Sequence, residues 1–90
     1  MIDGALEVGM KYKVLLFASL KEHVGGDAWE CESDQALTGK ALMERFFEKH
    51  PSMEGLRLVT RLAVNMQFCG LEHPLNADDE IAMIPPVSGG

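Results

Sequence analysis

The sequence predicts an α+β fold in which a mixed sheet is covered on one face by one main helix. The chain has 90 residues, of which 47% are apolar and 24% are charged, so it is long enough for one globular domain with one core. Segments with the two-residue alternation of strands lie on both sides of a single segment with helical spacing. This order of elements is typical of two-layer α+β domains.

Residues 11–20 (KYKVLLFASL) are predicted to form the first strand. Its alternation assigns four side chains to the core face: Tyr12, Val14, Leu16 and Ala18. Leu15 and Phe17 fall on the opposite face beside lysines. That face is either an exposed apolar patch that binds a partner, or it is buried because the strand is central and is covered on both faces at one end.

A second strand is predicted at residues 27–32, after a glycine-rich turn in residues 21–26. Trp29 and Cys31 alternate with polar neighbours, as in a half-buried strand. We expect this strand to pair with the first one as an antiparallel hairpin with a longer connection.

Residues 38–50 (TGKALMERFFEKH) form the one clear helix of the prediction. Thr38 is a suitable N-cap, and Leu42 and Phe46 are four residues apart on one face that can lie on the sheet. Pro51 is expected to end the helix.

Three further strands are predicted at residues 61–65, 68–71 and 80–84, with a turn at Met66 and Gln67 between the first two. In the last strand Ile81 and Met83 point inward, which leaves its two alternate residues facing out. These are Ala82 and Ile84. They match the outward pair of the first strand, and the two pairs are predicted to form one patch.

The chain ends directly after the last predicted strand in the run Pro85, Pro86, Val87, Ser88, Gly89 and Gly90. Prolines favour extended backbone, and glycines can follow a channel too narrow for other residues. We therefore divide the chain into an N-terminal extension (1–10), a domain (11–84) and a projecting tail (85–90). The terminal carboxylate is a poor electrophile, so any chemistry there requires an enzyme that activates it.

The chain resembles the MoaD/ThiS family in four segments: KVLLFASLKEHVG, RFFEKHP, LAVN and DDEIAMIPPVSGG. The resemblance runs from residue 11 to residue 90, and the last segment is its most specific part. It implies a ubiquitin-like β-grasp fold and, within the family, a sulfur carrier subunit of molybdopterin synthase. The two cysteines without CxxC spacing, and a start without the pattern of a signal peptide, predict a reduced, cytoplasmic protein. Such a chain is the sulfur-donating, non-catalytic subunit of an enzyme complex.

For the tail, the resemblance implies that a MoeB-like enzyme adenylates the carboxylate of Gly90 with ATP and that a sulfur donor protein then converts it to a thiocarboxylate. Gly89 lets the end reach the active site of a MoaE-like large subunit, where the sulfur passes to cyclic pyranopterin monophosphate. The inserted tail comprises Pro85, Pro86, Val87 and Ser88. Two small and two large subunits are expected to assemble, and this chain binds no cofactor itself.

The resemblance also implies a partner-binding surface on the sheet. The matching positions are Phe17, Phe68 and Ile84, with Lys21 as a basic neighbour. Related chains often have arginine in place of Lys21, and a lysine cannot offer the same bidentate pairing.

Composition excludes several function classes. Eight basic and fourteen acidic residues give a net charge of −6, which repels a phosphate backbone, so we expect no nucleic-acid partner. No apolar run reaches the length of about 20 residues that a membrane span needs. The glycines form no nucleotide-binding motif.

Other reactive residues have plainer interpretations. Cys31 and Cys69 lack any signature of an activated thiolate, and the three histidines lack the spacing of a metal pair. The acidic run 78–80 is read as a solvated turn before the last strand. No metal site is predicted.

Three alternatives to a molybdopterin synthase carrier remain open. A ThiS-like carrier for thiamine thiazole formation shares the Gly-Gly end but typically lacks the preceding Pro-Pro run. A ubiquitin-like modifier would link Gly90 to a lysine of its target. A simple binding module would tolerate loss of Gly89 and Gly90.

Overall fold

The computed structural model describes residues 9–86, which form a five-stranded mixed sheet. The strands are β1 (Met10–Leu16), β2 (Ala28–Ser33), β3 (Arg61–Val64), β4 (Gln67–Cys69) and β5 (Ile81–Ile84). Their order across the sheet is β2-β1-β5-β3-β4. The central strands β1 and β5 run parallel and every other pair is antiparallel, which confirms the predicted mixed sheet and the hairpin of the first two strands.

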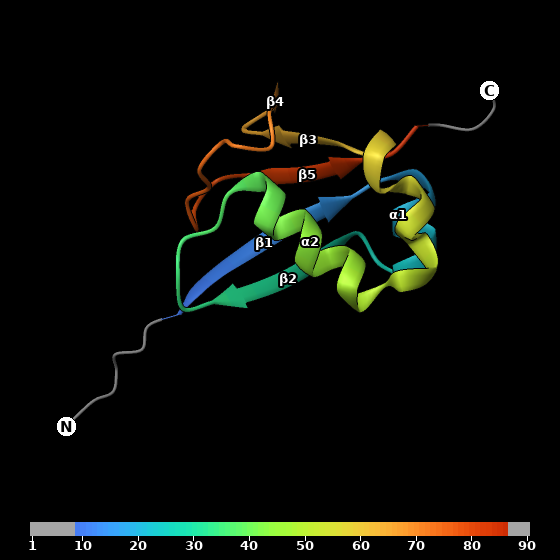
Figure 1. Cartoon of the computed structure of the whole chain (residues 1–90), viewed down its shortest axis with the longest axis horizontal. Coiled ribbons are helices and arrows are strands. Elements are labelled where there is room, and N and C mark those ends of the chain that lie inside the picture. The colour runs from blue at the N-terminus through green and yellow to red at the C-terminus, as the bar shows by residue number, and fades with distance from the viewer. Residues whose placement is uncertain (1–8, 87–90) are drawn as a thin grey trace.

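One face of the sheet is covered by α2 (Gly39–Lys49), as Figure 1 shows. The Thr38 hydroxyl accepts a hydrogen bond from the Ala41 amide at 3.3 Å, which confirms the predicted N-cap. On the inner face of α2, Phe46 is fully buried and packs edge-to-face on Trp29, with ring centroids 5.2 Å apart. The core therefore lies between this helix and the sheet, as the alternation predicted.

The predicted first strand is wrong beyond Leu16, because the chain turns there and forms α1 (Ala18–Val24). Ala18 has a φ of 52°, so the backbone leaves the extended conformation abruptly. Leu20 is buried, and Gly25, with a φ of 82°, caps the helix as its amide donates to the Lys21 carbonyl. The glycines predicted to form a turn thus end a helix.

Pro51 ends α2 but starts a second helical segment that the sequence analysis missed, the 3₁₀ helix η2 (Pro51–Val59). The proline occupies its first turn, where its missing N–H costs nothing. Together α1 and η2 gather at the end of the sheet where β5 leaves it (Figure 1). None of the helices described between residues 9 and 86 has the length and apolar character that a bilayer span requires.

The β3–β4 hairpin turns one residue earlier than predicted. Asn65 and Met66 occupy the two central turn positions with φ of 54° and 70°, the signature of a tight turn that matches strand twist. Asn65 is also tied to the start of β5, where its backbone N–H donates to the Glu80 carbonyl at 2.7 Å and its side chain accepts from the Glu80 amide at 2.9 Å. The predicted strand 68–71 is accordingly β4, displaced toward the turn.

Candidate docking surface and reactive tail

The sheet face opposite α2 carries an apolar row that crosses four strands. Leu15 of β1 lies beside Ala82 of β5, which lies beside Ala63 of β3, which in turn lies beside Phe68 of β4. Side chains in register on one face point the same way. The two alanines at the centre of the row are small, so the flanking residues enclose a shallow hollow.

That hollow has a volume of about 270 Å³, and we call its apolar lining the outer patch. The patch comprises Leu15, Phe17, Ala63, Met66, Phe68, Ala82 and Ile84. Phe17 is 45% exposed and Phe68 54% exposed. Large apolar side chains held out of the core in one contiguous group mark an interaction site.

The rest of this sheet face is charged. Toward the β2 edge, Lys13 lies opposite Glu30, and Lys11 forms an ion pair with Glu32 at 3.7 Å. Because the face is polar at β2 and apolar at β5, its apolar half is a distinct surface and not an extension of the core.

The structure brings three of the four predicted partner-binding residues together. The outer patch is lined by Phe17, Phe68 and Ile84. The alternation of the first and last strands had predicted this position for Phe17 and Ile84. Lys21 does not line it, since it lies on α1 and pairs with Asp27 at 3.2 Å. The basic group at the patch is instead Arg61, whose guanidinium lies 3.7 Å from the centre of the Phe68 ring.

Sequence reasoning missed Arg61, although a signal was present. Arg61 precedes Leu62 in β3, so the parity that points Leu62 inward points Arg61 outward with Ala63. Met66 was missed because its position depends on a turn that the pattern placed one residue too late.

The tail leaves the sheet from its central strand. Pro85 follows β5 directly and is buried, whereas Pro86 is exposed. Since Ile84 of the outer patch immediately precedes them, the root of the tail borders the outer patch. The remaining tail residues of the prediction, Val87, Ser88, Gly89 and Gly90, lie outside the described residues.

Other reactive groups of the described chain are not poised for chemistry. Burial raises the pKa of the Cys31 and Cys69 thiols, which keeps them protonated at neutral pH. His23 and His50 meet edge-to-face at 5.3 Å, and burial, then His23 and Lys49, lower the pKa of His50. Residues 9–86 hold no group of three His, Cys, Asp or Glu side chains suited to a metal ion.

Asp79, in the acidic run before β5, has a structural role. Its carboxylate accepts hydrogen bonds from the Asn76 amide at 2.8 Å and from the Asn65 side chain at 3.1 Å. These bonds lower its pKa, the Asn76 amide contributing most. The predicted turn is present, and Asp79 fastens it to the β3–β4 hairpin.

Comparison with known proteins identifies the family. Residues 14–90 match the model of the ThiS family. The chain belongs to the MoaD/ThiS family of sulfur carriers. A molybdopterin synthase sulfur carrier subunit from Dictyostelium discoideum is 36% identical over 84 residues, covering 89% of this chain and 96% of the relative. Its counterpart from Escherichia coli (strain K12) is 38% identical over 82 residues, covering 87% and 98%. Within the family, the chain is thus a carrier of the molybdopterin synthase type.

Solved structures agree on the β-grasp fold. SAMP1, the small archaeal modifier protein 1 of Haloferax volcanii, superposes with a TM-score of 0.74 at 27% identity, covering 89% of this chain and 99% of that chain. A chain from the solved complex of subunits 1 and 2 of the Helicobacter pylori molybdopterin-converting factor superposes with a TM-score of 0.62 at 24% identity. The match covers 90% of this chain and 100% of that chain. At this identity the second likeness concerns the fold alone.

Proposed function

We propose that this carrier bears its sulfur on the carboxyl group of Gly90 and that the outer patch docks the large subunit of molybdopterin synthase. The observation that carries the proposal is the Pro-Pro-Val-Ser-Gly-Gly ending directly after β5, the strand at the centre of the outer patch. The tail and the docking surface therefore share one strand, so docking of the patch brings the tail to the partner.

The chemistry begins with activation of a stable carboxylate. An oxygen of the Gly90 carboxylate attacks the α-phosphorus of ATP on a separate activating enzyme, and pyrophosphate leaves. A donor of the hydrosulfide class then displaces AMP directly. With a persulfide donor, displacement of AMP gives an acyl disulfide, and a thiol attacks the donor's sulfur of that S–S bond, which forms a new disulfide with the donor and releases the thiocarboxylate. The result is a thiocarboxylate, which carries one sulfur per chain.

The thiocarboxylate then donates its sulfur to cyclic pyranopterin monophosphate in the large subunit. The product dithiolene contains two sulfurs, so two loaded carriers are consumed for each product. The six residues from Pro85 to Gly90 span at most about 20 Å when fully extended. The acceptor must therefore bind within that distance of the docked patch.

Docking follows from the apolar character of the patch. Phe17 and Phe68 are half exposed in the free chain and would be covered by the partner. A substitution that puts a charge there forces an unpaired ion into the interface. The curated relatives are subunits of molybdopterin synthase, which supports a partner of this kind.

The first test is the intact mass of the chain after incubation with an activating enzyme, ATP and a sulfur source. We expect the mass change of one oxygen replaced by one sulfur, and none in a chain lacking Gly90 or in a reaction without ATP. If the chain lacking Gly90 supports molybdopterin synthesis as well as the full chain, the assignment of Gly90 is wrong.

The second test addresses docking. Phe17→Glu should weaken binding to the purified large subunit, measured by calorimetry, by at least about tenfold. Ala36→Glu is the matched control, because it adds the same charge at an exposed site between β2 and α2, away from the patch. Equal affinity of the two variants would remove Phe17 from the interface.

A second candidate function is that of a protein modifier, which the likeness to small archaeal modifier protein 1 favours. In that function the activated Gly90 carboxyl forms an amide with a lysine of a target protein and AMP leaves. Covalent adducts that survive denaturation, and that require Gly90, would identify it. The curated relatives favour the molybdopterin synthase role over the modifier role, and the Pro85-Pro86 pair favours it over the ThiS-like role.

A further inference from the structure

The large apolar side chains exposed in residues 9–86 fall into two groups. Phe17, Met66 and Phe68 belong to the outer patch. Leu58, Val59 and Leu71 lie apart from it, and Leu58 is 95% exposed. Folding gains nothing from holding a leucine in water, so a second group of this kind requires its own explanation.

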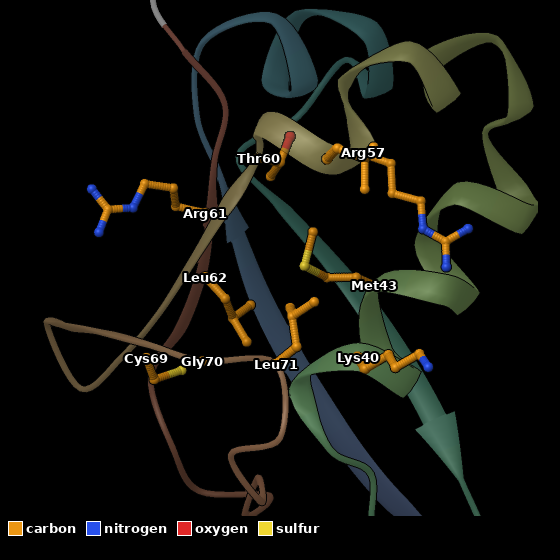
Figure 2. A pocket seen from close by; sticks show the side chains of 10 residues that line it. Lys40, Met43, Arg57, Thr60, Arg61, Leu62, Cys69, Gly70 and Leu71 are labelled. Carbon is orange, nitrogen blue, oxygen red and sulfur yellow. The ribbon is translucent and has the colours of Figure 1, made fainter.

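The second group surrounds a hollow of about 390 Å³ between α2, the end of η2 and the β3–β4 hairpin, which we call the edge pocket (Figure 2). Leu58 and Leu71 line it, and Val59 follows Leu58 in the chain. Figure 2 shows Met43, Leu62 and Cys69 pointing into the space between the helix and the sheet edge. The floor of the edge pocket is therefore apolar.

The rim is basic, although the chain as a whole is acidic. Lys40, Arg57 and Arg61 line the edge pocket, three of the eight basic residues of a chain with net charge −6. Arg57 is already paired with Glu44 at 3.4 Å and Glu54 at 3.5 Å. Within residues 9–86, no carboxylate forms an ion pair with Lys40 or Arg61. Two cations on this rim are thus available to carboxylates of a partner.

Arg61 joins the edge pocket to the outer patch. It lines the edge pocket, while its guanidinium stacks on Phe68, which lines the outer patch. Stacking uses the face of the guanidinium and leaves its N–H edges free for a carboxylate. The two apolar surfaces are therefore continuous around the β4 edge of the sheet.

The arrangement fits a protein segment better than a small molecule. In Figure 2 the side chains of Arg57 and Arg61 extend away from the hollow on opposite sides and do not converge on its centre. Small-ligand sites need convergent polar groups, whereas protein interfaces combine an apolar centre with a polar rim.

We infer that the edge pocket is a second docking surface, which takes a segment of the same large subunit bearing an apolar side chain flanked by carboxylates. The apolar side chain covers Leu58 and the pocket floor, and separate carboxylates on either side of it pair with Lys40 and with Arg61. This inference rests on the proposed function, because it extends the outer-patch interface around the β4 edge.

The test measures binding of the purified large subunit to Leu58→Glu and Lys40→Glu variants of the full chain. Both positions are exposed, and glutamate near the start of α2 suits the helix dipole, so both variants should fold. Unchanged thermal unfolding checks this. We expect Leu58→Glu to weaken binding about tenfold or more, and Lys40→Glu to weaken it and flatten its dependence on salt.

Ala36→Glu and Phe17→Glu complete the design. If Leu58→Glu and Lys40→Glu bind like Ala36→Glu while Phe17→Glu binds weakly, the edge pocket is not an interface and the inference is overturned, but the proposed function stands. If Phe17→Glu also binds normally, or if the unaltered chain does not bind the large subunit, the proposed docking itself fails. Weak binding by Phe17→Glu, Leu58→Glu and Lys40→Glu supports both.

Discussion

Gly39→Ala should destabilise the domain, although alanine is the better helix former. Gly39 is the buried first residue of α2, and a Cβ there would lie 2.5 Å from Leu62 Cδ2 and 3.3 Å from the Leu71 carbonyl oxygen. The helix cannot shift to relieve this contact, because the Gly39 and Lys40 amides donate to carbonyls of the 71–73 loop at 3.0 and 2.8 Å.

The size of this destabilisation follows from overpacking of the core. Forcing a methyl group into a packed core costs roughly 1–3 kcal/mol, and the gain in helix propensity offsets at most about 1 kcal/mol. We therefore expect a loss of about 1–2 kcal/mol, which lowers Tm by roughly 5–15 °C in a domain of this size. Thermal and urea unfolding followed by circular dichroism measure both quantities.

Gly55→Ala is the matched control, because a Cβ at Gly55 meets nothing within 4 Å. It should leave stability unchanged or slightly raised. Repeating Gly39→Ala in a Leu62→Val background removes the clashing Cδ2 and should reduce the cost by at least about 0.5 kcal/mol. The steric explanation is refuted if Gly39→Ala is as stable as Gly55→Ala, or if its cost is the same in both backgrounds.

Three further predictions concern the turn, the histidine pair and the acidic run. Met66→Gly should raise the free energy of unfolding by about 0.5–1 kcal/mol in urea titrations, since Met66 has a φ of 70°; a loss of stability would show that this backbone is not strained. The lowered pKa of His50 means that the unfolded chain binds the proton more readily, so stability should fall as the pH drops below the ordinary value of 6.5. His50→Asn should flatten that slope between pH 7 and 5, and an unchanged slope would assign it to other groups. The lowered pKa of Asp79 means that its ionised carboxylate stabilises the fold above pH 3.8, and this stabilisation is lost as the pH falls through the pKa of the folded state. Asp79→Ala should therefore destabilise the fold at pH 7 and speed hydrogen exchange at the Asn76 amide, which donates to this carboxylate. Unchanged protection of that amide would contradict the hydrogen bond.

Strand parity predicted the outer patch because a period of two fixes which side chains share a face. Leu15 and Ala82 fall in register across the parallel β1–β5 pair, and Ile84 and Phe17 continue the same face. Which strands are neighbours was not needed for that conclusion. The helix prediction succeeded for a similar reason, because an N-cap at Thr38 and a regular apolar stripe are both local features.

The missed elements depend on single backbone conformations. The first strand ends because Ala18 has a positive φ, which alanine adopts only when the surrounding packing imposes it, and composition gives no sign of it. The short η2 helix lacks the 3.6-residue period that reveals an α-helix. The basic group of the patch was assigned to Lys21 by resemblance, but in this chain α1 directs Lys21 to Asp27.

The position of β5 links the proposed docking to the proposed sulfur transfer. It is the middle strand of the sheet, paired on both sides, and its inward residues Ile81 and Met83 are fully buried. A strand held in this way cannot slide when the tail is engaged, because a shift of one residue would turn the buried side chains out of the core. The root of the tail at Pro85 therefore stays fixed relative to the outer patch. Substitutions in the patch should then lower affinity for the large subunit, while the transfer rate at saturating partner remains unchanged.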